Sequence, residues 1–212
     1  YETIPKFHDT VKRFRDFKDA LRKDVKNRAR LCREEIEFVL AREDDCGVLM
    51  KQLEEGILPL RVTHNDTKLN NILFDKNTGE GLCIIDLDTI MPGLAANDFG
   101  DSIRFGASTA EEDEKDLNKV HFDIELYRIY VKGYLEMAKD VLTPAENASL
   151  PWGARLMTLE CGMRFLADFL QGDVYFKTTY PEHNLVRART QFRLVKEMEE
   201  QFDQMQEIVE TF

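Results

Sequence analysis

One stretch of the sequence decides the fold: Arg61-Val62-Thr63-His64-Asn65-Asp66-Thr67-Lys68-Leu69-Asn70-Asn71-Ile72-Leu73. A short apolar run leads into a polar loop with the pattern H-x-D-x-K-x-x-N, and a second apolar run follows directly. A third apolar run, residues 82–85, ends in Asp86-Leu87-Asp88. One carboxylate of such a set can accept a hydroxyl proton, while the Asn and a second carboxylate hold Mg²⁺ on nucleotide phosphates. The pattern predicts a kinase-type centre that transfers a phosphoryl group to a hydroxyl.

The composition is that of an ordinary globular protein with one domain or two small ones. The chain has 212 residues, of which 43% are hydrophobic and 33% charged. Its net charge of -11 argues against nucleic acid or anionic membrane as a partner. No apolar run approaches membrane-spanning length. The four cysteines lie far apart in the sequence, so free thiols and a cytoplasmic location are expected.

Helical periodicity covers most of the chain outside this stretch. Residues from about 8 to 56 predict two or three amphipathic helices with breaks near Asp44-Asp45 and at Gly56, and Ile36, Val39 and Leu40 mark one apolar stripe. A short β segment is expected at about 60–63, and a helix near Asn97-Asp98. An acidic stretch, residues 111–114, predicts a solvated loop or helix start. Further helices are expected at about 119–139, 153–171 and 184–210.

A β-hairpin is predicted directly after the polar loop. Its arms are residues 71–75 and 82–86, and the connection between them contains the turn sequence Asn77-Thr78-Gly79. An antiparallel pair places Asn71, at the start of one arm, beside Asp86, at the end of the other. The expected fold is therefore α+β and mainly α, with a small antiparallel hairpin that carries the catalytic loop.

Each polar residue of the loop has a chemical role and a plainer alternative. Asp66 is the candidate base, or else an ordinary turn-capping Asp. Lys68 can reach the transferred phosphate as a point charge, or is a surface lysine. Asn71 and Asp86 offer oxygen ligands to Mg²⁺, or else a strand-edge hydrogen bond and a turn. His64 is expected to anchor the loop rather than to move protons.

The tripeptide Asp98-Phe99-Gly100 does not predict the metal-binding element of a protein kinase. It lies too far after Asn71, and no A-P-E sequence follows it. The magnesium role is assigned to Asp86 instead. Asp98 and Asp101 are expected to cap the following helix and to brace the catalytic loop.

These residues resemble the aminoglycoside phosphotransferase and choline kinase superfamily, which shares the protein kinase fold. The resemblance rests on His64-Asn65-Asp66 with Asn71, on Ile85-Asp86-Leu87-Asp88, and on Asp98. Within the superfamily the chain is most similar to the N-acetylhexosamine 1-kinases. The similar segments are Glu2-Thr3-Ile4-Pro5, residues 64–71, residues 85–89, Arg164-Phe165-Leu166, residues 172–177 and His183-Asn184-Leu185.

The resemblance implies ATP- and Mg²⁺-dependent phosphorylation of the anomeric hydroxyl of N-acetylglucosamine or N-acetylgalactosamine. It assigns the role of base to Asp66, magnesium ligation to Asn71 and Asp86, and sugar contacts to Asp88, Thr89, Arg164 and Tyr175. Plainer explanations stay open for the sugar contacts. Arg164 is four residues from both Glu160 and Asp168, so a helical salt-bridge ladder would also explain it. Tyr175 would fit a core or interface, and Thr89 a turn.

The chain departs from the superfamily pattern in two ways. Asn65 stands where a Gly is usual. The sequence has no Gly-rich phosphate loop and no V-A-I-K-like lysine, since Gly79 and Gly81 belong to the hairpin turn. Residues 1–212 are therefore expected to be the C-terminal lobe alone. The N-terminal nucleotide-binding lobe would be a separate part of the same protein, and the isolated lobe would bind ATP weakly and turn over negligibly.

Other functions remain open at this point. Residues 84–89 are similar to the D-x-D nucleophile strand of haloacid-dehalogenase-like phosphatases, although the rest of the chain predicts helices. A kinase-like module that binds a sugar without transferring phosphate is a third possibility. Among kinases, choline, ethanolamine, aminoglycosides and homoserine are alternative acceptors. A choline pocket needs an aromatic cage, and an aminoglycoside pocket needs dense acidic groups. The cationic side chain of Arg164 suits neither a choline pocket nor an aminoglycoside pocket.

Overall fold

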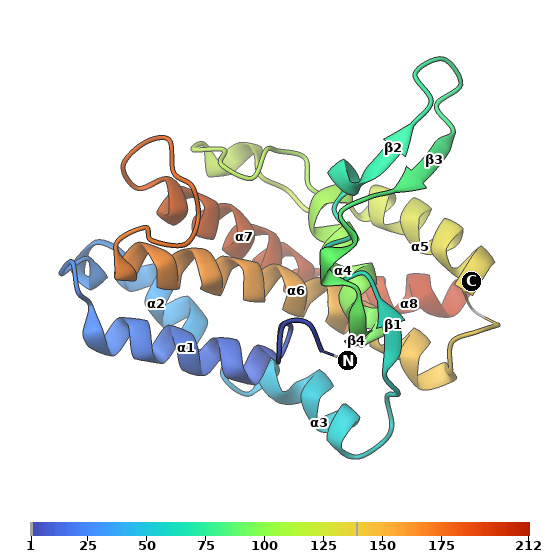
Figure 1. Cartoon of the computed structure of the whole chain (residues 1–212), viewed down its shortest axis with the longest axis horizontal. Coiled ribbons are helices and arrows are strands. Elements are labelled where there is room, and N and C mark those ends of the chain that lie inside the picture. Colours follow the sequence, from blue (N-terminus) through green and yellow to red (C-terminus); the bar gives the residue numbers. More distant parts are fainter. Residues whose placement is uncertain (1, 139) are drawn as a thin grey trace.

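A computed structural model describes residues 2–138 and 140–212, and it shows helices packed around one central helix, α6 (Pro144–Gln171) (Figure 1). Two small antiparallel sheets lie at one side of the helical body. The predicted α+β fold with mainly helical content is thus confirmed. Tyr1, where the expected lobe begins, and Lys139, where one expected helix ends, lie outside the described residues.

The N-terminal region forms three helices, as predicted. They are α1 (Thr10–Lys23), α2 (Arg33–Leu40) and α3 (Val48–Glu54), with short 3₁₀ turns at residues 29–31 and 45–47. Asp9 caps α1 by accepting a hydrogen bond from the backbone N–H of Lys12. Ile36 and Val39 of α2 are buried, but Leu40 is exposed, so its place in the apolar stripe is wrong. Leu40 is the last residue of α2, at the exposed end of the helix.

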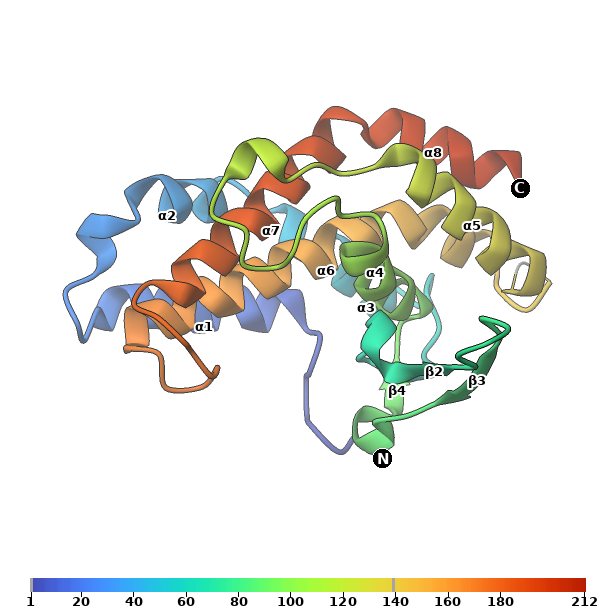
Figure 2. The ribbon, with the colours of Figure 1, turned by 90° about the horizontal axis from the view of Figure 1, so that it is seen from above.

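Each of the two sheets has two strands. The strand β1 (Arg61–Thr63) pairs with β4 (Met91–Gly93), which the sequence did not predict, and β2 (Ile72–Phe74) pairs with β3 (Gly81–Ile84). The predicted hairpin is confirmed, although its strands are shorter than expected and leave Asn71 and Asp86 just outside them. The hairpin extends away from the helices (Figures 1 and 2). The polar loop, residues 64–71, connects one sheet to the other.

The central helix α6 begins earlier than the expected residue 153. Thr143 and Glu146 form a capping box, in which each side chain bonds the other's backbone N–H, and Pro144 follows the cap. Pro151 lies inside the helix without ending it. Gly172, at φ 101°, closes the helix in the left-handed conformation that glycine adopts without strain. Its C-terminal end was predicted correctly.

Four further helices pack on the body: α4 (Ala95–Gly106), α5 (Ile124–Ala138), α7 (His183–Glu200) and α8 (Phe202–Thr211). The helix expected from residue 119 starts at Ile124, because residues 117–119 form a 3₁₀ turn. The single helix expected over 184–210 is two helices separated at Gln201. None of the helices in the described part of the chain is long and apolar enough to cross a bilayer.

Two groups of buried side chains form the core on either side of α6. One joins α6 to α1, α2, α3 and α7, and the other joins α4, α5 and α8 to α6 and α7. The contact between α4 and α6 is made by backbone, because a Cβ on Gly153 would overlap the carbonyl oxygen of Ala96 and a Cβ on Gly100 would overlap the carbonyl oxygen of Gly153. This close approach fixes α4, which carries Asp98 and Asp101.

Candidate active site

The loop after β1 is held by a carboxylate of α4. Asp98 accepts hydrogen bonds from the backbone N–H groups of His64 (2.8 Å, to Oδ2) and Asn65 (2.7 Å, to Oδ1). Burial raises the pKa of Asp98, and the two N–H donors oppose that rise. The expected cap is wrong, since Leu94 precedes α4 and Asp98 lies inside it. Asp101 also lies inside α4 and pairs with Arg104, so it neither caps the helix nor bonds the loop.

Asn65 turns the loop and fills its interior. Its φ of 64° lies in the left-handed region, which Asn tolerates better than most residues and Gly adopts freely. Its Nδ2 donates to the carbonyl oxygens of Thr63 (3.2 Å) and Thr89 (3.0 Å), and its Oδ1 accepts from the Thr63 hydroxyl (3.0 Å). Asn at this position therefore keeps the backbone geometry that a Gly would permit and adds bonds between the loop and β1.

His64 connects the loop to the end of β3. Its Nε2 lies 3.0 Å from the carbonyl oxygen of Ile85, and its Nδ1 lies 3.3 Å from the backbone N of Asp66. A carbonyl only accepts and an N–H only donates, so these partners require the neutral ring with its proton on Nε2. The Thr89 hydroxyl donates to the His64 carbonyl at 2.7 Å. These contacts match an anchoring role for His64.

One carboxylate oxygen of Asp66 accepts hydrogen bonds from the loop, and the other has no such bond. Oδ2 of Asp66 accepts from Lys68 Nζ at 2.8 Å and from Asn71 Nδ2 at 2.9 Å, and the same Nδ2 donates to the Asp66 carbonyl at 2.9 Å. Within residues 2–138 and 140–212, Oδ1 of Asp66 makes no hydrogen bond to protein. A fixed carboxylate with one free oxygen can accept a bond from a ligand hydroxyl.

Asn71 and Asp86 lie at the base of the hairpin. The backbone N of Ile85 donates to the Asn71 carbonyl at 2.9 Å, so Asp86 is one position beyond the partner of Asn71. Asn71 is only 5% exposed, and its amide NH₂ is committed to Asp66. Asp86 is exposed, with φ 62°. The described residues contain no cluster of three or more His, Cys, Asp or Glu side chains that could hold a metal without other ligands.

A cavity of about 570 Å³ opens beside Asp66. Of the residues predicted from sequence, Asp66, Lys68, Thr89, Arg164 and Tyr175 line it. Tyr175 is 72% exposed and is therefore not a core residue. Asp88 is exposed and does not line the cavity, so the structure does not bring this predicted sugar contact to the others.

Comparison with known families agrees with this geometry. The model of the phosphotransferase enzyme family matches residues 2–139, which is well over half of the chain. The chain belongs to this phosphotransferase family. Its kinases generally use ATP and Mg²⁺. The matched region contains the polar loop, residues 64–71, together with the hairpin and α4.

The phosphatase alternative does not fit this phosphotransferase. A D-x-D nucleophile strand would be followed by alternating strands and helices. Here Asp86 and Asp88 follow β3, which among the described residues pairs only with β2, in an antiparallel hairpin. After Asp88 the described chain adds the short strand β4 and then helices, with a single isolated bridge between Ser108 and Phe122.

Arg164 of the phosphotransferase is not part of a helical salt-bridge ladder. Glu160 bonds to His8, and Asp168 accepts from the backbone N–H groups of residues 174–176. The Arg164 guanidinium instead lies 5.5–5.9 Å from the ring centres of Phe7, Tyr175 and Phe176. Within the described residues it makes no ion pair or hydrogen bond. Its five N–H donors remain for a ligand.

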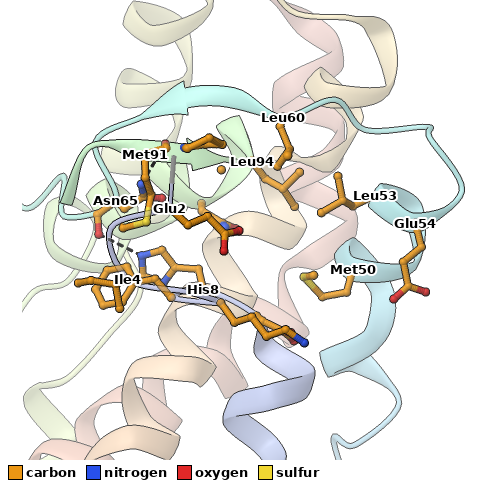
Figure 3. Close-up of a pocket in the computed structure, with 16 residues that line it drawn as sticks. Glu2, Ile4, His8, Met50, Leu53, Glu54, Leu60, Asn65, Met91 and Leu94 are labelled. Atoms are coloured by element: carbon orange, nitrogen blue, oxygen red, sulfur yellow. Dashed lines mark hydrogen bonds and ion pairs between the residues drawn. The ribbon is translucent and has the colours of Figure 1, made fainter.

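Sequence reasoning missed His8 and Glu160. His8 Nε2 lies 3.0 Å from the Asn65 carbonyl oxygen and its Nδ1 lies 2.9 Å from Glu160 Oε1 (Figure 3 shows the contact with Asn65). Burial opposes the charge on each, yet each partner favours it: Glu160 raises the pKa of His8, and His8 holds the pKa of Glu160 below its usual value. The only sequence signal was the position of His8 just after residues 2–5.

The cavity is not acidic. Four carboxylates and five cationic side chains line it. The carboxylates are Asp66, Asp101, Glu112 and Glu160, and the cations are Lys68, Arg104, Arg164, Lys177 and Arg187. Protonation of His8 adds further positive charge. The phosphotransferase therefore offers its cavity ligand a nearly balanced set of charged hydrogen-bonding groups.

Proposed function

We propose that the protein transfers the γ-phosphoryl group of ATP to a hydroxyl of a neutral acceptor, with the anomeric hydroxyl of an N-acetylhexosamine as the first candidate. The observation that carries the proposal is the state of Asp66. One carboxylate oxygen is held by Lys68 and Asn71, while the other is unbonded at the wall of the cavity. This arrangement suits a base that orients an acceptor hydroxyl.

Each residue of the loop has a role in that reaction. Asp66 accepts the proton of the attacking hydroxyl, and Asn71 and Lys68 fix the carboxylate that does so. Lys68 Nζ, 2.8 Å from Asp66, brings positive charge to the region where the transferred phosphoryl group carries negative charge. His64, Asn65 and Asp98 keep the loop in position.

Asn71 and Asp86 are the residues that would hold Mg²⁺. The amide group of Asn71 donates to Asp66 through its nitrogen, which leaves its oxygen for a cation. Asp86 adds an exposed carboxylate. A carboxylate and an amide oxygen are the hard ligands that Mg²⁺ prefers, with nucleotide phosphates and water as the remaining ligands. When bound, the ion would neutralise charge on those phosphates.

A neutral acceptor fits the cavity better than a cationic one. The aromatic group formed by Phe7, Tyr175 and Phe176 surrounds the Arg164 guanidinium, so a choline headgroup would meet a positive charge where its cage should be. The five cationic side chains that line the cavity outnumber its four carboxylates, which disfavours a polycationic aminoglycoside. The free donors of Arg164 suit an acetamido carbonyl.

We further propose that this chain acts as the C-terminal lobe of a kinase-like fold, with a separate N-terminal lobe of the same protein covering the nucleotide. Support comes from apolar side chains that the hairpin exposes, among them Leu73, Phe74, Leu82 and Ile84. The chain alone should then bind ATP weakly and turn over negligibly. The four free cysteines agree with a cytoplasmic location.

The role of Asp66 is tested by kinetics with Mg²⁺-ATP and N-acetylglucosamine, using the chain joined to the nucleotide-binding lobe. Asp66→Asn should lower kcat by about 10²- to 10⁴-fold, the range for a general base, with little change in KM for the sugar. Asp203→Asn, at an exposed position of α8, is the matched control and should behave like the wild type. A kcat for Asp66→Asn within a few-fold of the control would exclude Asp66 as base.

A further inference from the structure

Glu160 has a carboxylate oxygen that no protein group satisfies. The residue lies in the middle of α6 and is 1% exposed. Its Oε1 bonds His8 Nδ1 at 2.9 Å, and Arg13 Nε lies 3.8 Å from the same oxygen. Oε2 is buried and has no hydrogen-bond partner within the described residues. Glu160 lines the same cavity as Asp66.

Asp101 of α4 repeats this pattern on another helix. It is 6% exposed, and its Oδ1 accepts from Arg104 Nε at 3.2 Å and Nη2 at 3.0 Å. Its Oδ2 is buried and has no partner in the part of the chain that the structure describes. Asp101 also lines the cavity beside Asp66. Two helices therefore each bring one half-bonded carboxylate to the cavity.

A buried carboxylate oxygen without a donor is costly and rare in proteins. Surface exposure does not explain these two, because both side chains are almost completely buried. Their bonded oxygens explain how the side chains are oriented: His8 holds one and Arg104 the other. The unbonded oxygens are therefore available to donors, and both residues line the cavity.

We infer that Glu160 and Asp101 form a recognition subsite that accepts hydrogen bonds from two donors, hydroxyl or amide N–H groups, of the neutral acceptor held at Asp66. The subsite rests on the proposed function in naming that acceptor. Arg164 supplies donors to the same cavity, so the ligand that fits combines hydroxyl donors with a carbonyl acceptor. A sugar carrying an acetamido group has both.

The subsite also excludes some ligands. A carboxylate or phosphate placed against Glu160 or Asp101 would meet like charge with no donor between them. A deoxy sugar would leave one of the oxygens unsatisfied, and loss of a hydrogen bond to a charged group weakens binding by about ten- to a hundredfold. Selectivity for hydroxyl-bearing ligands is thus the measurable property of Glu160 and Asp101.

Two isosteric variants remove the charge from the free atoms, and Asp101→Asn also replaces the free acceptor by a donor. In Glu160→Gln the buried His8 ring is neutral: its Nε2–H donates to the Asn65 carbonyl, so Nδ1 accepts from the amide NH₂ and the uncharged amide oxygen takes the place of Oε2, where a hydrogen bond is weaker than to a carboxylate. In Asp101→Asn the donors of Arg104 hold the amide oxygen, so the NH₂ group takes the place of Oδ2. Glu197→Gln is the matched control, because Glu197 is also a buried carboxylate, bonded to Phe122 N and His121, and does not line the cavity.

The experiment measures Kd by calorimetry or ligand-observed NMR for N-acetylglucosamine, N-acetylgalactosamine and their 3-, 4- and 6-deoxy analogues. In the wild type and in Glu197→Gln, at least one deoxy analogue should bind about ten- to a hundredfold more weakly than its parent. In Glu160→Gln or Asp101→Asn that same penalty should shrink to a few-fold. The ratio of two ligands on one variant cancels any general loss of fold or loop position.

The outcomes separate the subsite from the catalytic proposal, because binding does not require transfer. Deoxy penalties that are the same in all four proteins, or sugars that do not bind at all, would overturn the subsite. If the penalties respond as expected but the wild type with its nucleotide lobe phosphorylates no sugar, the subsite stands and the proposed activity fails. If sugars are phosphorylated but the variants do not change the deoxy penalties, the proposed activity stands and the subsite fails.

Discussion

Replacing Asp98 by Ala should destabilise the fold much more than an ordinary loop substitution. The change removes both acceptors for the backbone N–H groups of His64 and Asn65, which lie 2.8 and 2.7 Å from the carboxylate. Each N–H left unsatisfied away from water costs about 1–3 kcal/mol, so the expected loss is about 2–6 kcal/mol. That is a large part of the total stability of a typical domain, about 5–15 kcal/mol.

Asp75→Ala is the matched control for this prediction. Asp75 also accepts two backbone N–H groups, those of Asn77 and Thr78, each at 2.8 Å, but these groups are exposed in the hairpin turn. Water can replace the lost acceptor there, so the expected loss of stability is small. The two variants thus differ in burial while sharing the number of bonds removed.

Urea unfolding followed by circular dichroism measures the difference in the free energy of unfolding. Amide hydrogen exchange measures the same effect locally, since His64 and Asn65 should lose protection in Asp98→Ala while the core of α6 retains its own. Equal stability of Asp98→Ala and Asp75→Ala would refute the claim that Asp98 holds the loop. Unchanged exchange at His64 and Asn65 would refute it as well.

Three further predictions concern stability and thiol chemistry. Gly153→Ala should cost at least about 1–3 kcal/mol in urea unfolding, since a Cβ there overlaps the backbone of α4, whereas Gly133→Ala, with open space in α5, should gain about 0.5–1 kcal/mol. Glu160 raises the pKa of His8, so the stability that this pair contributes is fully present below about pH 6.5 and is lost as the pH rises through the pKa of His8 in the folded protein. Glu160→Gln should therefore weaken the decrease of the unfolding free energy with rising pH. An unchanged pH dependence would contradict the pairing. Ellman's reagent should modify the exposed Cys83 first, because burial raises the thiol pKa to about 11 in Cys32 and about 12 in Cys46 and Cys161.

The features that sequence predicts well here are local. The hairpin follows from two short apolar arms around an Asn-Thr-Gly turn, and the loop residues from Asp66 to Asn71 come together because only a few residues separate them. The brace from Asp98 was expected from its match to the superfamily pattern. Its failure to cap α4 depends on where the helix starts, which sequence places only to within a few residues.

The features that sequence could not predict depend on distant partners. Helical spacing places Arg164 near Glu160 and Asp168, but Glu160 is bonded to His8, which is 152 residues away in the sequence. The sequence likewise does not predict that one carboxylate oxygen of Glu160 and one of Asp101 are buried without a hydrogen-bond donor, because that depends on distant parts of the fold. Asp88 was assigned to the sugar contacts by the family resemblance, yet the turn at residues 87–89 leaves it outside the cavity.

The central claim, phosphoryl transfer to a neutral hydroxyl acceptor, is tested most directly by a competition for Mg²⁺-ATP followed by ³¹P NMR. N-Acetylglucosamine, N-acetylgalactosamine, choline and an aminoglycoside are mixed at equal concentration with the chain and its nucleotide-binding lobe. We predict a phosphate signal on the anomeric carbon of an N-acetylhexosamine and none on the two cationic acceptors. Phosphocholine or a phosphorylated aminoglycoside as the main product would contradict the account.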